Sequence, residues 1–378
     1  MYFSVPYRTV PSIPSDIINM AAPWDHLGPI GAFGAGSAEN ANWWRRITLI
    51  WGALSLLVVF VVEISAATLD GTNFWERHGF EREAASWCEA SGSAYARTES
   101  LFIRESSNAR SDYSYVSVGI GMITLGVADA LANRRHRKGS AGDTGDTGDG
   151  ANALLAHPEI TLAHGVTNIL HGFGTFWFHA CQCSEGGRMD VAGMLAVVAW
   201  PAVYSCAQLA WQRSAGRPCG TTRRVARAVA TVQLCLVPFF HGIRADSSTG
   251  MFVLVLSAIA FVVGYAATYR HVTRMRPAPL IATILLFIVG LLAWNADQEK
   301  LGAKCNPDSW VQGHAAWHVL TCFAIITLYV YFRTEVPRDG HSGGVAAATS
   351  SIIDTGSDQV FATAAVVPAR DAGNAADC

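Results

Sequence analysis

Eight long apolar segments constrain the fold of this chain more than any other feature. An α-helix needs about 20 mainly apolar residues to cross the hydrocarbon core of a bilayer. Of the 378 residues, 51% are hydrophobic and only 15% are charged, whereas a typical soluble domain carries about 25% charged residues. We therefore predict an all-α integral membrane protein, with spans at 47–69, 113–132, 160–182, 189–212, 224–242, 250–269, 278–296 and 312–332.

Clusters of Arg and Lys set the predicted orientation, because basic residues collect in cytosolic loops. Arg45 and Arg46 precede the first span, and further basic residues follow the second, fourth, sixth and eighth spans, among them Arg134, Arg223, Arg270 and Arg333. With eight spans, these clusters all fall on one side, so both termini are predicted to be cytosolic. The predicted organisation is a cytosolic segment at 1–46, a first helix at 47–69 and a disordered cytosolic tail at 333–378.

Four polar side chains fall at the opposite ends of their spans. His179 lies near the end of the third span, Asp190 begins the fourth, and His314 and His318 begin the eighth. All four are therefore predicted at one depth, close to the lumenal or exterior face. Ionisable residues cost roughly 2.5–3.5 kcal/mol at the centre of a span on insertion scales, and they mark functional sites by default.

The histidines suggest a metal site. His314 and His318 are four residues apart, so they share one helix face and can hold one ion. His179 would complete the set of three histidines that catalytic zinc uses, with a fourth position left for water. Asp190 would take the proton from that water, and the Thr175 hydroxyl would stabilise a developing oxyanion. His164 and His171 share the third span and could compete as ligands. His171 would lie about two turns deeper than His179, and it is interpreted as a packing or hydrogen-bonding residue, as is His241.

A single His-x-x-x-His pair is more often a packing feature than a metal site, so the prediction depends on the shared depth. The main alternative from the residues alone is a structural membrane protein with polar contacts between its helices. The net charge of −2 gives no indication of a nucleic-acid partner. The nine cysteines include no CxxC pair. Cys88 and Cys305 lie in polar segments and could be bridged if both face an oxidising compartment.

Three stretches together resemble one family. "GFGTFWFHA", an Asp eleven residues after His179, and "HAAWHVLT" in the last span are similar to the alkaline ceramidase family. These are seven-helix membrane hydrolases related to adiponectin-receptor-like proteins. The resemblance implies that His179, His314 and His318 bind zinc and that Asp190 activates water. Thr175 stands where the family has Ser.

The segment 86–115 resembles the N-terminal segment of the same family, in which a Trp-Cys-Glu run is followed by a Glu and an Asn-x-x-Ser-Asn run. The resemblance implies a disulfide between Cys88 and Cys305. It also implies a calcium site, because Ca²⁺ prefers oxygen ligands. Ser91 stands where the family has an Asn ligand. The implied calcium ligands are Trp87, Glu89, Ser91 and Glu105.

The resemblance covers 86–332 and implies a seven-helix domain that hydrolyses ceramide to a sphingoid base and a fatty acid, in the endoplasmic reticulum, Golgi or plasma membrane. The substrate would enter from the bilayer, and the active site would face the lumen or exterior. The alternatives are a zinc-containing receptor of the adiponectin-receptor type and a hydrolase of another lipid amide or ester. The Trp-Cys-Glu run favours the ceramidase.

Overall fold

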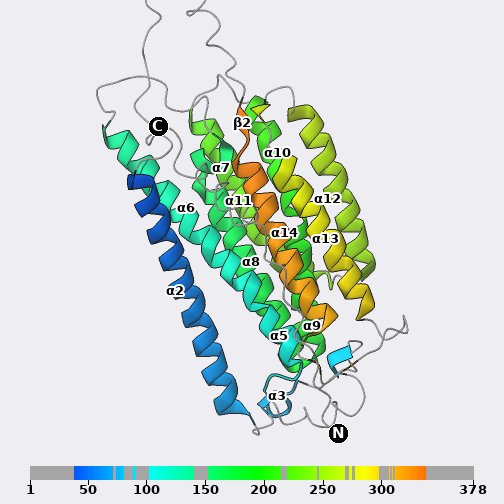
Figure 1. The fold of residues 1–378 in the computed structure, drawn as a ribbon. Coiled ribbons are helices and arrows are strands. Elements are labelled where there is room, and N and C mark those ends of the chain that lie inside the picture. Colours follow the sequence, from blue (N-terminus) through cyan, green and yellow to red (C-terminus); the bar gives the residue numbers. More distant parts are fainter. Residues whose placement is uncertain are drawn as a thin grey trace, which may run out of the picture.

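The computed structural model describes residues 38–70, 74–80, 88–90, 102–139, 152–213, 219–244, 247–268, 272–274, 277–297, 306, 309 and 311–337. Within these residues, every predicted span is helical, which confirms the all-α prediction (Figure 1). The long helices are α2 (Ala38–Leu69), α6 (Tyr113–Gly139), α8 (Pro158–Cys181), α9 (Ser184–Val198), α10 (Trp200–Arg213), α11 (Cys219–Gly242), α12 (Ser247–Thr268), α13 (Pro277–Ala296) and α14 (Gly313–Arg333).

Several of these helices have the length and composition of membrane spans. Six such stretches occur in the described residues: Arg45–Leu69, Ser106–Arg134, Ser184–Ala210, Arg223–Gly242, Pro277–Ala296 and Gly313–Arg333. Phe252–Ala267 in α12 is a shorter apolar helix. The six stretches indicate a membrane protein. The start of α2 and the end of α14 lie at the same end of the bundle, as an even number of crossings requires (Figure 1).

Helix α8 lies at the centre and packs mainly against α6, α9 and α11. Its contact with α6 depends on two glycines. A Cβ on Gly119 of α6 would lie 2.6 Å from the carbonyl oxygen of Gly165, and a Cβ on Gly165 would lie 2.8 Å from that of Gly119. Small residues let two backbones approach closely in a membrane bundle. This contact therefore fixes how α8, which carries His179, sits on α6.

The predicted span at 189–212 is two helices, α9 and α10, with Ala199 between them. Pro201 explains the break, because it lacks an N–H and its ring clashes with the carbonyl of the residue four positions earlier. The span predicted there lies within the single apolar stretch Ser184–Ala210 and differs only in that its helix is divided at Ala199.

Helix α2 begins at Ala38, within the segment predicted as cytosolic, and packs on α6. Trp51 Nε1 donates to the Ser117 carbonyl at 2.6 Å. Glu63 accepts two hydrogen bonds from Arg110, at 2.7 and 2.9 Å, and a third from the Tyr113 hydroxyl. This intramembrane carboxylate is therefore paired across two elements. The predicted segment before Ala38 lies outside the described residues.

The start of the predicted tail is ordered, which corrects that prediction for 333–337. Arg333 is buried in the last turn of α14, and β2 (Val336–Pro337) pairs antiparallel with β1 (Val272–Arg274). The rest of the predicted tail lies outside the described residues. Among the described residues there are also four short helices: α3 (Phe74–Arg77), the 3₁₀ helix η2 (Cys88–Ala90), α5 (Ser106–Ser111) and α7 (Ala153–Ala156).

Candidate metal centre

Three histidines meet inside the bundle, as their spacing predicts. His179 lies in the last turn of α8, and His314 and His318 lie in the first turns of α14. All three are buried, with exposures of 0, 5 and 3%. One ligand nitrogen from each lies within 4.8 Å of the others. The residues therefore form a cluster that can hold a metal ion.

The Nδ1 atoms of His179 and His318 lie close to protein oxygens. Glu105, just before α5, contacts His179 through its Oε2 atom and the ring Nδ1. Asp112 Oδ1 lies 2.8 Å from His318 Nδ1, and Ser111 Oγ is also 2.8 Å from that nitrogen. An ionised carboxylate can only accept, so His179 Nδ1 carries the hydrogen and His179 Nε2 presents a lone pair. The Ser111 hydroxyl donates its hydrogen to the Asn108 carbonyl at 2.6 Å, so His318 Nδ1 must donate to Ser111 Oγ, and His318 Nε2 also presents a lone pair. Carboxylates in this position orient metal-binding imidazoles.

The distance between the Nε2 atoms of His179 and His314 is suitable for two ligands of one zinc ion. His314 Nε2 lies 3.2 Å from His179 Nε2. A tetrahedral zinc with Zn–N distances of about 2.0–2.1 Å separates its ligand nitrogens by about 3.3 Å. Because His179 Nε2 presents a lone pair, a cation or a proton must lie between it and His314 Nε2. The donor set therefore fits a bound zinc ion.

Asp190 and Thr175 are joined directly. Thr175, on α8, donates from Oγ1 to Asp190 Oδ1, on α9, at 2.6 Å. Thr175 lies four residues before His179, so the pair sits beside the histidine cluster. The contact supports a role for Thr175 in holding Asp190. The predicted role of Thr175 at an oxyanion stays a prediction.

The predicted calcium ligands are only partly described, because Trp87 and Ser91 lie outside the described residues. Glu89 accepts from the backbone N–H groups of Ser107 and Asn108, at 2.6 and 3.0 Å, and so caps α5. Burial raises the pKa of Glu89 above its usual range. Both carboxylates thus already accept protein N–H groups, since Glu105 accepts from Gln182 Nε2 at 2.6 Å besides its contact with His179. Calcium binding here stays a prediction.

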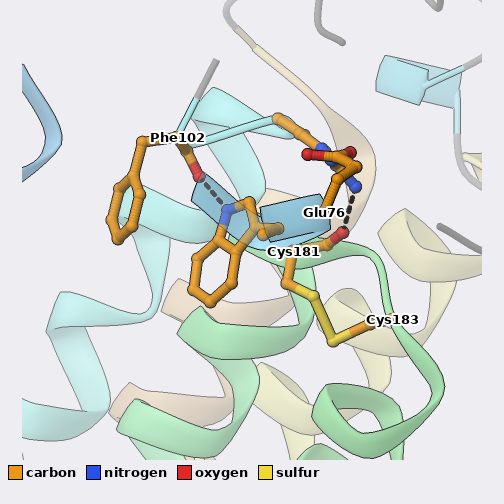
Figure 2. Close-up of a disulfide and its surroundings, with 6 residues drawn as sticks. Glu76, Phe102, Cys181 and Cys183 are labelled. Carbon is orange, nitrogen blue, oxygen red and sulfur yellow. Dashed lines mark hydrogen bonds and ion pairs between the residues drawn. A yellow bond between two sulfur atoms is a disulfide. The ribbon is translucent and has the colours of Figure 1, made fainter. Parts of the chain in front are cut away.

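A disulfide between Cys181 and Cys183 fixes the turn from α8 to α9 (Figure 2). Gln182 between them is left-handed, with φ +53°. Arg104 donates to the Cys181 carbonyl at 2.6 Å and pairs with Glu76 of α3. This turn therefore sets the spacing between His179 and Asp190.

A carboxylate that follows α13 accepts a hydrogen bond from the first turn of α14. Asp297, just after α13, accepts from the Gly313 N–H at 3.1 Å, which satisfies one of the unpaired amides that every helix N-terminus leaves.

Cys88 is buried and disulfide-bonded. Its predicted partner Cys305 lies outside the described residues, so that pairing stays a prediction, which thiol labelling before and after reduction would test.

The fold and the site together define a class: a helical membrane protein with a buried cluster of three histidines able to hold a metal. A family model described as ceramidase matches residues 83–339, more than half of the chain, which therefore belongs to the ceramidase family. Membership supports a ceramide-hydrolysing function and implies an amide hydrolase with a lipid substrate at a membrane. The match begins after α2. A search of curated proteins found no match.

Proposed function

We propose that this protein is a zinc-dependent intramembrane amidase, which hydrolyses ceramide to a sphingoid base and a free fatty acid. The observation that carries the proposal is the convergence of His179, His314 and His318 beside the Thr175–Asp190 pair, in a chain of the ceramidase family. The two hydrocarbon chains of ceramide account for a hydrolytic site inside a membrane bundle.

In this proposal, the three imidazoles hold the metal through one nitrogen each. Glu105 and Ser111 keep His179 and His318 in the tautomer that leaves Nε2 as the ligand atom. A bound Zn²⁺ would supply Lewis-acid polarisation of the amide carbonyl and activation of the attacking water.

Asp190 carries the proton transfer. Its carboxylate accepts a proton from the attacking water as the new C–O bond forms at the carbonyl carbon. It then delivers that proton to the amide nitrogen as the C–N bond breaks, so that the sphingoid base leaves as an amine. The Thr175 hydrogen bond to Oδ1 leaves Oδ2 for this transfer.

We propose that the site faces the lumen or the exterior, in the endoplasmic reticulum, the Golgi or the plasma membrane. The start of α14, which carries His314 and His318, lies at the end of the bundle opposite the start of α2, the helix that carries Arg45 and Arg46 (Figure 1). Basic residues favour the cytosolic side. Large apolar side chains are exposed on both helices that carry the histidines, including Phe173 on α8 and Phe323 on α14. The substrate can therefore approach through lipid.

The test is turnover of a panel of ceramides by the purified full chain in nanodiscs, together with metal analysis. We expect about one zinc per chain, loss of turnover on chelation and recovery on adding zinc back. His314→Ala should lose both zinc and turnover. A zinc-containing chain that leaves every ceramide intact but cleaves another lipid amide or ester would overturn the substrate. A chain that binds no zinc would overturn the mechanism.

A further inference from the structure

Helix α8 carries a buried polar row along the side that faces the bundle. Its members lie three or four residues apart, and each is at most 5% exposed: Thr161, His164, Asn168, His171, Thr175 and His179. Residues at this spacing share one helix face. Two members, His164 and His171, lie deeper in the bundle than the metal centre, and the proposed chemistry uses neither of them. Buried ionisable groups in a membrane span mark function by default.

His171 differs from His164 in what it touches. His171 Nδ1 lies 3.1 Å from Thr175 Oγ1, the atom that donates to Asp190 Oδ1 at 2.6 Å. His164 instead stacks on the Trp200 ring, with centroids 4.2 Å apart, and contacts Asn168. His171 is therefore linked to the proposed proton carrier through one intervening hydroxyl.

The direction of these hydrogen bonds follows from the donors available. A threonine hydroxyl has one hydrogen, and an ionised carboxylate can only accept. Thr175 Oγ1 also lies 3.0 Å from the His171 carbonyl oxygen, but the contact with Asp190 is shorter, and hydrogen bonds to a charged acceptor are stronger. The hydrogen of Thr175 therefore goes to Asp190. The hydroxyl oxygen is left as an acceptor, so His171 Nδ1 must carry a hydrogen and donate it.

The ring of His171 is confined from two sides. A Cβ on Gly193 of α9 would lie 2.6 Å from His171 Cα and 2.9 Å from its Nδ1 atom, so α9 passes directly against this residue. On the α6 side, the Tyr115 ring lies with its centroid 4.4 Å from that of His171. Packing on both sides restricts the rotamers of the imidazole and keeps Nδ1 directed at Thr175.

We infer that His171 is a positioning residue of the hydrolytic site: its Nδ1–H holds the Thr175 hydroxyl, which holds Asp190 by Oδ1. The inference rests on the proposed function in assigning proton transfer to Asp190. A misplacement of about 1 Å at a reacting group can lower the rate by about a hundredfold. Fixing Oδ1 from α8 limits how the Asp190 carboxylate, on α9, can rotate.

The test compares three variants of the full chain in nanodiscs. His171→Leu removes the donor, and we expect kcat to fall about tenfold or more, with KM and zinc content unchanged. His171→Asn places an N–H near the position of Nδ1 and should restore most of kcat. His164→Leu is the matched control, a buried histidine on the same helix outside the chain of hydrogen bonds, and it should leave kcat unchanged. An equal loss of kcat in the two leucine variants, or no rescue by asparagine, would overturn the inference.

A double-mutant comparison isolates the link through Thr175. Thr175→Val breaks the chain of hydrogen bonds, so adding His171→Leu should cause little further loss of kcat, because coupled residues are not additive. Full additivity of the two losses would contradict the link.

A readout that needs no turnover separates this inference from the proposed function. In ¹⁵N-histidine-labelled protein, the resonances lost in His171→Leu identify the ring nitrogens of His171. We expect Nδ1 to be protonated and Nε2 to be unprotonated at neutral pH. The opposite tautomer overturns the inference even if ceramide is the substrate. The expected tautomer in a chain that hydrolyses no ceramide would support the hydrogen-bond chain while the proposed reaction fails.

Discussion

Asp112 Oδ1 lies 2.8 Å from His318 Nδ1, and both side chains are buried. Asp112 directly follows α5 and His318 lies on α14, so this contact joins a short helix to the metal centre. It parallels the contact of Glu105 with His179. Two of the three imidazoles are thus oriented by carboxylates at either end of α5.

Asp112→Ala should weaken zinc binding about ten- to a hundredfold, the usual effect of losing a partner of a metal-binding histidine. Asp112→Asn keeps the shape of the side chain without the charge and should give a smaller loss. Ser111→Ala is the comparison, because Ser111 Oγ lies at the same distance from the same nitrogen. Competition with a chelator of known affinity measures all three. Unchanged affinity in Asp112→Ala would show that the carboxylate does not orient His318.

The three-histidine cluster could be predicted from the sequence, because it follows from residue spacing within one helix and from the order of the spans. The i,i+4 spacing places His314 and His318 on one face, and the order of the spans brings His179 to the same end. The contacts of Glu105 and Asp112 could not be predicted. They depend on how α5 is rotated between α8 and α14, and neither hydrophobic periodicity nor span order encodes that rotation. From the sequence, Glu105 is predicted only as a calcium ligand, which the family resemblance implies.

Asp190→Asn should retain zinc and lose ceramide turnover by about 10²–10⁴-fold, because an amide cannot accept the proton. Its Oδ1 atom can still accept from Thr175, so the local geometry should survive. Thr175→Ser keeps the hydroxyl and should be tolerated, whereas Thr175→Val should not. The measurements are kcat, KM and zinc content. A fully active Asp190→Asn enzyme would falsify the role of Asp190.

The burial of Arg333 and its pairing with Asp129 could not be predicted from the sequence. Its position after the last span places it with the cytosolic basic residues, yet it is only 3% exposed. Two of its nitrogens donate to Asp129 of α6, at 2.7 and 2.9 Å. The partner lies 204 residues away, so counting charges near helix ends cannot detect it. Arg333 therefore joins α14 to α6, the helix on which α8 packs.

Removing one member of this buried pair should be strongly destabilising. Asp129→Ala or Arg333→Met should each lower the free energy of unfolding by about 3–5 kcal/mol, because the remaining charge stays buried without its partner. Arg188 and Glu185 form the control pair, since both are partly exposed on α9, and breaking an exposed pair costs about 0–1 kcal/mol. Unfolding in mixed micelles measures both. Equal effects at the two pairs would contradict the burial argument.

Glu335 should make stability depend on pH at the opposite end of the bundle from the metal centre. Its Oε2 atom accepts from the Tyr204 hydroxyl and from Gln208 Nε2, both at 3.2 Å. Burial raises the pKa of Glu335 to about 8, although the Tyr204 hydrogen bond lowers it. The folded state therefore holds a proton on Glu335 between pH 4.5 and about 8 that the unfolded chain has released.

Because the folded state binds more protons in this window, the contribution of Glu335 to stability is lost as the pH rises through it, by at most about 1.4 kcal/mol per pH unit. Glu335→Gln mimics the protonated side chain at every pH. The variant should match the wild type in Tm near pH 4.5 and exceed it increasingly toward pH 8. Taking the difference between the two proteins removes the contribution of other groups, such as Glu89, whose pKa is also raised. A constant difference in Tm from pH 4.5 to 8 would show that Glu335 does not bind this proton.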